Sequence, residues 1–394
     1  MAFILSNAGG SVSAAGGSVG GSVGGSVGTA IYGDAFATPL FVEALNRSRG
    51  AIIDLDQTKP LWDLGRRKQA TAFFQWDPWV RTYLVAQELV SSVRFKVHQP
   101  TDAEHSAGEE PWVKAQFWNE PVGTGPGAWL DGVTIHRPPE SVFEGQLALV
   151  LSWAELREER ASEILAQVEN QHAFWGELLP IQADRLRCTR ELLEAAIQFA
   201  VYMEMKFKHE LACWRPTDYS PYVQPMITTP GHGSLPSGHC TQSYVVVEVL
   251  KALLNTMHLG PAYKLFNIQL GRMATRIATN RVVAGVHFPV DNAAGRVLGT
   301  VLGEYFAYRC RARLPSANLP PRFHAWHAGQ FLGSKYPADE DFDPYRQKLQ
   351  PGNTAPFYEF TAPADTLRTP KESVLSTLWD QAKKECHDLG LVFE

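Results

Sequence analysis

The longest apolar stretches of this sequence are interrupted by charged residues, and this limits the fold more than any other feature. They run over 192–207 and 244–257 and include Glu204 and Glu248. A membrane-spanning helix needs about 20 mostly uncharged residues, so the pattern predicts a soluble protein with no membrane span. The net charge of -5 argues against a general nucleic-acid binder.

Apolar residues recur at helical spacing from residue 141 onward, which predicts a mainly α fold, a helical bundle with long loops. Helices are expected from 141, around 164–168, from Thr189, at about 238–257, 261–279 and 289–311, and from Thr369 to near Gly390. Few strand signals are present. The Pro-, Gly- and Trp-rich stretch 99–139 is predicted to be a long surface loop.

Composition divides the chain into four parts. Residues 1–30 repeat Gly-Gly-Ser-Val and are expected to form a flexible tail. Residues 31–140 are a mixed helical and loop region that packs on the bundle. Residues 141–313 are the catalytic bundle, and 314–394 form a Pro- and aromatic-rich extension with a terminal helix.

The cysteine pattern favours a reducing compartment. The five cysteines are odd in number, widely spaced and without a Cys-x-x-Cys pair, which disfavours disulfide scaffolds and zinc modules. The N-terminus has no basic region before its short apolar stretch. Cytoplasmic localisation is therefore the default expectation, and export by another route stays open.

Two cations stand at the end of a predicted helix. Lys208 lies near its C-terminus, and Arg215-Pro216 follows seven residues later. Basic side chains at a helix C-terminus complement the dipole, so this segment alone favours solvated surface charges. Its functional interpretation depends on two further segments.

The second segment, Pro236-Ser237-Gly238-His239, precedes an apolar helical run. Serine suits a helix N-cap, and glycine lets a ligand approach the backbone closely. A helix N-terminus offers free N–H groups to an oxyanion, and His239 could exchange a proton with that ligand. The alternative is a plain N-cap beside an exposed histidine.

The third segment holds Arg281, His287 and Asp291. Pro289 suits the first turn of a helix, so Asp291 lies in that turn and can reach back to one ring nitrogen of His287. The other nitrogen is then free to act as a ligand or a nucleophile. The alternative is a capped helix start with a surface histidine.

Together the three segments predict a site for a tetrahedral oxyanion. The cations are Lys208, Arg215 and Arg281, the neutral donors are Ser237 and the Gly238 amide, and the imidazoles are His239 and His287. Positive charge would surround the equatorial oxygens, with one histidine on each side of the central atom.

This arrangement resembles the superfamily of type 2 phosphatidic acid phosphatases, bacterial non-specific acid phosphatases and vanadium-dependent haloperoxidases. The superfamily signature is Lys-x6-Arg-Pro, Pro-Ser-Gly-His and Ser-Arg-x5-His-x3-Asp. The motifs span 208–291, and Asn280 stands where serine is usual. The resemblance implies that family's helical bundle.

The sequence is most similar to the haloperoxidase branch, in the loop 210–239 and in Ala284-Gly-Val-His-Phe-Pro-Val-Asp291. That resemblance implies a vanadate cofactor with vanadium bound to His287, and His239 as acid–base. The oxyanion ligands would be Lys208, Arg215, Ser237, Gly238 and Arg281. Asp291 would orient His287. Hydrogen peroxide, a halide and a small organic molecule would be the substrates.

The residue seven positions before His239 is His232. The resemblance associates histidine there with bromide-oxidising members and phenylalanine with chloride-oxidising members. Oxidation of bromide and iodide is therefore expected. The alternative is a polar loop residue without a role.

Two other functions stay open. In a phosphomonoesterase, His287 would attack phosphorus and His239 would protonate the leaving oxygen, with phosphate as the ligand. A non-catalytic scaffold would use the repetitive N-terminal tail, but converging buried cations without a ligand are costly. The sequence leaves the oligomeric state open, including a homo-oligomer.

Overall fold

The computed structural model describes residues 39–52, 73–106, 108–119, 126–169, 171–181, 185–254, 261–310, 326–350, 355–361 and 373–391. The repetitive tail predicted over 1–30 lies outside these residues. The helices are α4 (Pro39–Ile52), α5 (Pro78–Val90), α6 (Asp102–Ser106), α7 (Glu140–Trp153), α8 (Arg157–Glu169), α9 (His172–Gly176), α10 (Arg187–Leu211), α11 (Pro216–Tyr219), α12 (Gly238–Leu253), α13 (Pro261–Val283), α14 (Pro289–Cys310) and α15 (Val374–Asp388). The strands are β1 (Val93–His98), β2 (Trp112–Asn119), β3 (Ala128–His136), β4 (Ala328–Phe331) and β5 (Tyr358–Thr361).

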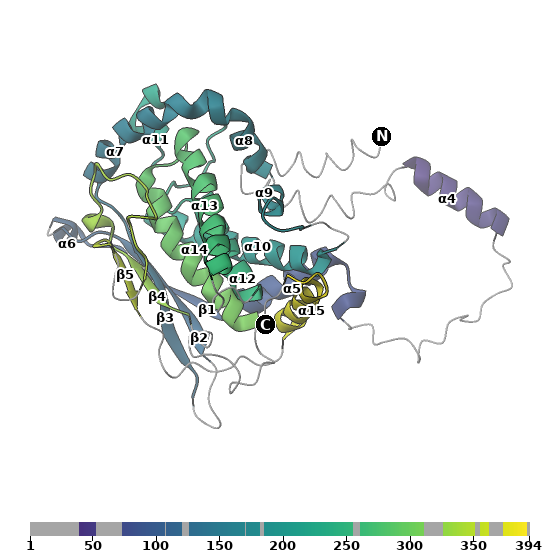
Figure 1. The fold of residues 1–394 in the computed structure, drawn as a ribbon. Helices are drawn as coiled ribbons and strands as arrows, with labels where there is room; N and C mark the ends of the chain where they lie inside the picture. The colour runs from purple at the N-terminus through teal and green to yellow at the C-terminus, as the bar shows by residue number, and fades with distance from the viewer. Residues whose placement is uncertain are drawn as a thin grey trace.

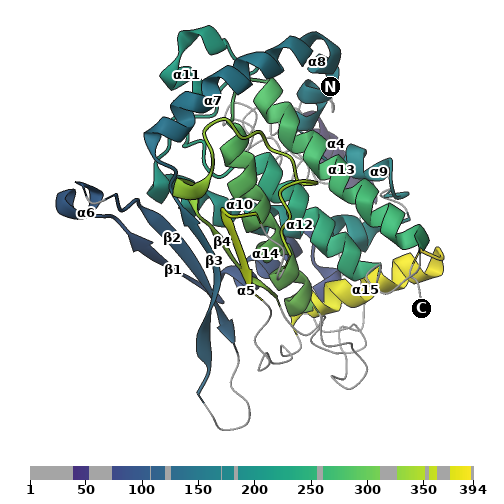
Figure 2. The ribbon, with the colours of Figure 1, turned by 60° about the vertical axis from the view of Figure 1, so that its left-hand side comes forward.

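The mainly helical fold class is confirmed. Helices α10, α12, α13 and α14 form the bundle, with α7, α8 and α11 across one end and α5 and α15 at the other (Figures 1 and 2). Helix α12 is buried along nearly its whole length, which explains why its sequence lacks a polar face. No helix in the described ranges is long and apolar enough to cross a membrane.

Three glycines of α14 let it approach α12 closely. Gly295, Gly299 and Gly303 are four residues apart and therefore share one face of the helix. A Cβ atom at Gly295 would lie 2.8 Å from the Ser237 carbonyl oxygen, and one at Gly299 would collide with the Thr241 carbonyl oxygen. Only glycine permits this backbone separation, which holds the N-termini of the two helices side by side.

The prediction of a long surface loop over 99–139 is wrong, because this region contains β2 and β3. The sheet has the order β1-β2-β3-β4-β5, antiparallel except where β3 pairs in parallel with β4. One face of β2 packs on the bundle through Val113, Ala115 and Phe117, and the Phe117 ring stacks on Tyr305 of α14 with centroids 4.0 Å apart. The alternation of these residues has period two, as in a half-buried strand.

Two predicted helix starts differ from the structure. Helix α10 begins at Arg187, and Thr189 lies inside it, where Glu385 of α15 accepts hydrogen bonds from the Thr189 amide at 2.9 Å and the Cys188 amide at 2.8 Å. Ser373 caps α15, and the signature predicted at 369–372 lies outside the described residues. The carboxylate that caps α10 thus comes from nearly 200 residues away.

Gly299→Ala should separate α12 from α14 and lower the free energy of unfolding by about 1–3 kcal/mol, the usual cost of overpacking. Gly271→Ala is the matched control, because a Cβ atom there meets nothing within 4 Å. It should be neutral or stabilising by up to about 1 kcal/mol, the helix propensity difference. Denaturant unfolding of both variants measures the difference, and equal stability of Gly299→Ala and wild type would contradict this packing.

Candidate active site

Four helix ends meet at the end of the bundle that α8 covers. Helices α10 and α13 end there, and α12 and α14 begin there. The Ser237 amide donates to the Asp291 carbonyl oxygen at 2.9 Å, which joins the N-termini of α12 and α14 directly. Lys208, Arg215, Ser237, His239, Arg281, His287 and Asp291 are all at most 5% exposed. The three motifs are therefore one buried site.

Asp291 determines which nitrogen of His287 is free. Its Oδ2 accepts from His287 Nδ1 at 2.9 Å and from the Phe288 amide at 2.9 Å, while Ser234 Oγ donates to Oδ1. The proton of the neutral ring is thereby held on Nδ1, and Nε2 carries a lone pair. Burial and the nearby Arg215 lower the pKa of His287 well below its usual range. His287 is therefore a neutral imidazole with Nε2 available as a ligand or nucleophile.

Arg215 connects His287 to the preceding loop. Its Nη1 donates to His287 Nε2 at 3.2 Å and to the Val286 carbonyl oxygen at 2.7 Å. Its Nε donates to the His232 carbonyl oxygen, and Nη2 lies 3.1 Å from His232 Nδ1. Burial lowers the pKa of Arg215 to about 10, so the guanidinium stays charged. A fixed positive charge therefore adjoins His287 Nε2 and engages its lone pair, so a ligand or an electrophile at Nε2 would replace this hydrogen bond.

Lys208 organises the loop in front of α12. Its Nζ donates to the carbonyl oxygens of Gly233, Ser234 and Pro236 at 3.2, 3.0 and 2.5 Å. An ammonium has three donors, so all three are used within the protein. Burial, reinforced by the charge of Arg215, lowers the pKa of Lys208 to about 7.

Several buried polar atoms of the site have no hydrogen-bond partner among the described residues. They are the donors Arg281 Nε and Nη1 and Ser237 Oγ, together with His232 Nε2. A buried polar group without a partner costs about 1–3 kcal/mol, so leaving them unpaired is unfavourable unless a ligand pairs them. Arg281 remains charged, since burial lowers its pKa only to about 10. These donors suit the oxygens of a tetrahedral anion.

His239 donates Nε2–H to the Gln167 carbonyl oxygen at 3.0 Å. Burial, followed by the charge of Arg281, lowers the pKa of His239 to about 3. A bound anion would oppose the cations and favour protonation of His239.

His232 contacts Arg215 through its ring and its carbonyl oxygen. It is half-buried, and burial followed by Lys208 and Arg215 lowers its pKa to about 4. His232 Nδ1 lies 3.1 Å from Arg215 Nη2, which can only donate to it, and 3.1 Å from the Gly233 carbonyl oxygen, to which it can only donate, so the two contacts favour opposite tautomers. The neutral ring leaves Nε2 buried without a partner among the described residues.

The structure adds residues that the motifs did not indicate. Glu204 is fully buried one helical turn before Lys208, and burial raises its pKa to about 7. Its position four residues before Lys208, on the same face of the helix, was a signal in the sequence that could have indicated its place near the site. Gln167 of α8 and Ser234 had no such signal, because their contacts with Arg281 and Asp291 span more than 50 residues.

Residues 192–314 match the model of the PAP2 superfamily, and this range includes every motif residue from Lys208 to Asp291. This part of the chain is similar to the PAP2 superfamily. The matched range does not include the strands of the sheet or α15.

One solved structure similar to this chain is described as the crystal structure of the first transmembrane PAP2 type phosphatidylglycerolphosphate phosphatase from Bacillus subtilis. The two share 20% identity with a TM-score of 0.34, over 43% of this chain and 85% of that chain. No curated protein matches the chain.

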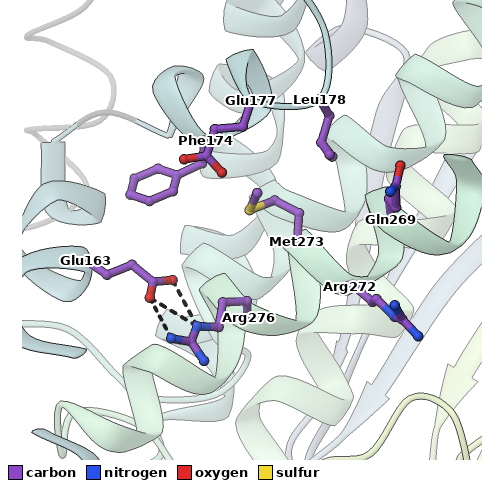
Figure 3. Close-up of a pocket in the computed structure, with 8 residues that line it drawn as sticks. All are labelled: Glu163, Phe174, Glu177, Leu178, Gln269, Arg272, Met273 and Arg276. Carbon is purple, nitrogen blue, oxygen red and sulfur yellow. Dashed lines mark hydrogen bonds and ion pairs between the residues drawn. The ribbon is translucent and has the colours of Figure 1, made fainter. Parts of the chain in front are cut away.

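A pocket of about 520 Å³ lies on the outer side of the PAP2 region (Figure 3). Its lining residues are Glu163, Phe174, Glu177, Leu178, Gln269, Arg272, Met273 and Arg276. The carboxylate of Glu163 pairs with the guanidinium of Arg276 at 2.9 Å. Two acidic and two basic residues balance each other, so charge selects no particular ligand here.

Binding of a tetrahedral dianion should draw protons into the site. Burial lowers the pKa of Lys208, and a bound dianion raises it again. Sulfate, which does not titrate in this range, should therefore bind with proton uptake, and its affinity should fall as the pH rises from about 6 to about 9.

Calorimetry in two buffers of different ionisation enthalpy measures this uptake. Lys208→Met should reduce the number of protons taken up, which separates the lysine from the three histidines. Equal proton uptake by Lys208→Met and wild type would contradict the role of Lys208.

Proposed function

We propose that this chain is a PAP2-superfamily hydrolase of small phosphomonoesters. The observation that carries the proposal is His287, a neutral imidazole oriented by Asp291, with Nε2 beside Arg215. Unpartnered donors of Ser237 and Arg281 are buried in the same site. A nucleophile, its orienting group and oxyanion donors are thus present together.

The reaction follows from these positions. His287 Nε2 forms a bond to phosphorus as the bond to the ester oxygen breaks, and His239 gives a proton to that oxygen. Asp291 stabilises the imidazolium character that develops on His287. Water then attacks the phosphohistidine, His239 takes a proton from that water, and inorganic phosphate leaves with Nε2 restored.

The cations would stabilise negative charge on the phosphate oxygens and would not transfer protons. Arg215 and Arg281 would neutralise the equatorial oxygens, with Ser237 Oγ and the Gly238 amide as neutral donors. Lys208 would contribute positive charge while it holds the loop. Because His239 and His287 are at most 5% exposed, water is largely excluded and each of these interactions is strengthened.

Halide oxidation with vanadate is the second candidate, and His232 favours it. The unpartnered donors of Arg281 and Ser237 fit vanadate, which is also a tetrahedral oxyanion. Together with the Gly238 amide they would hold its oxygens, Arg215 and Lys208 would add positive charge, and His287 Nε2 would bind vanadium in place of its hydrogen bond from Arg215. When bound, vanadate supplies the redox chemistry by which hydrogen peroxide oxidises a halide. The His232 ring, whose Nε2 has no partner among the described residues, would offer a further polar contact at that site.

One set of assays separates the two functions. Purified protein is tested for p-nitrophenyl phosphate hydrolysis and, with added vanadate, for peroxide-dependent bromide oxidation. His287→Ala should abolish the activity that is found, and Asp291→Ala should lower it by about 10–100-fold, as loss of an orienting group does.

His209→Ala is the matched control, because this histidine of α10 has an 81% exposed side chain. It should leave the activity unchanged. Phosphatase activity without bromide oxidation supports the first function, and the reverse result supports the second. Full activity of His287→Ala in both assays would contradict both.

His232→Phe tests the second function alone. Replacing a polar N–H group with a hydrocarbon ring removes a hydrogen-bond donor and makes the pocket drier. The chloride-to-bromide activity ratio should rise, while wild type should prefer bromide and iodide. A ratio that does not change, or equal wild-type turnover of chloride and bromide, would remove His232 from the argument for haloperoxidase activity.

A further inference from the structure

Gln167 of α8 contacts two of the three motif segments at once. Its side chain is fully buried, and Oε1 accepts from Arg281 Nη2 at 3.0 Å and from Asn280 Nδ2 at 3.0 Å. Its main-chain oxygen accepts from His239 Nε2 at 3.0 Å. One residue outside the PAP2 match therefore adjoins an oxyanion-binding arginine and a proton-transfer histidine.

We infer that Gln167 is a positioning residue that aims the guanidinium of Arg281 into the oxyanion site, an inference that rests on the proposed function. Arg281 Nη2 is occupied by Gln167 Oε1 and by the Ile164 carbonyl oxygen, both from α8. Nε and Nη1 are left without partners. These hydrogen bonds from α8 hold Nη2 of the planar guanidinium in place and leave Nε and Nη1 available to the ligand.

Asn280 holds Gln167 in this position. The family signature usually has serine at Asn280, and here its amide nitrogen donates to both Gln167 Oε1 and Glu163 Oε1, the latter at 2.9 Å. Gln167 Nε2 also donates to Glu163 Oε1 at 3.1 Å. A serine is too short to bridge two acceptors in this way. The departure from the signature is therefore matched to the residues of α8.

The chain of hydrogen bonds continues outward from Glu163 to Arg276 at the edge of the pocket in Figure 3. Arg276 lies on the same helix as Arg281, and its hydrogen bonds go to Glu163 rather than to the side-chain oxygen of Gln167. It therefore provides a control that disturbs α13 and Glu163 without removing the acceptor of Arg281.

The test is a double-mutant cycle on orthovanadate affinity, measured by calorimetry on the full chain. Gln167→Met keeps the side-chain volume and removes the acceptor, so affinity should fall by about 10–100-fold. In an Arg281→Lys background, Gln167→Met should lower the orthovanadate affinity by less than about 3-fold, because the guanidinium that Gln167 positions is absent. Arg276→Gln should stay within about 2-fold of wild type.

Thermal unfolding shows which variants remain folded. If Gln167→Met does not fold, Asn280→Ser takes its place in the same cycle, with an expected loss of about 3–10-fold that likewise vanishes beside Arg281→Lys. Equal losses in both backgrounds would overturn the inference while the oxyanion site stands. Absence of orthovanadate binding by folded wild type would instead overturn the proposed function.

Discussion

Asp291 is the residue on which the geometry of the site depends. Its main-chain oxygen accepts a hydrogen bond from the Ser237 amide. Its carboxylate accepts hydrogen bonds from the His287 ring, the Phe288 amide and the Ser234 hydroxyl. One residue therefore joins the starts of α12 and α14 and orients the reactive imidazole. Burial raises the pKa of Asp291 to about 6, so this carboxyl is kept ionised near neutral pH only by the hydrogen bonds and cations around it.

The second constraint is the burial of three cations in one place. Lys208 and Arg215 are compensated mainly by main-chain carbonyl oxygens of the loop 232–236. Arg281 is only partly compensated, by α8. Donors fixed in advance in a water-poor site stabilise developing charge without reorganising. The unpaired donors that are costly within the protein alone suit the site to an oxyanion.

The surrounding helices and sheet hold the residues of the site in fixed relative positions. The glycine face of α14 sets its distance from α12, and the sheet covers the bundle on one side. Strand β3 comes from before the PAP2 region and β4 from after it, so the two flanking segments meet in one sheet. All five cysteines are free, and noncovalent packing alone holds these segments together.

The local sequence determined the helices of the bundle and the composition of the site. Helical periodicity, capping residues and motif spacing act within a few turns of the chain, so the starts of α12 and α14 and the pairing of His287 with Asp291 could be predicted. The roles of Gln167, Glu385 and Gly299 could not, because each depends on a partner about 60 to 200 residues away. The sheet was missed for the same reason, since strands gain their stability from neighbours that only the tertiary structure brings alongside.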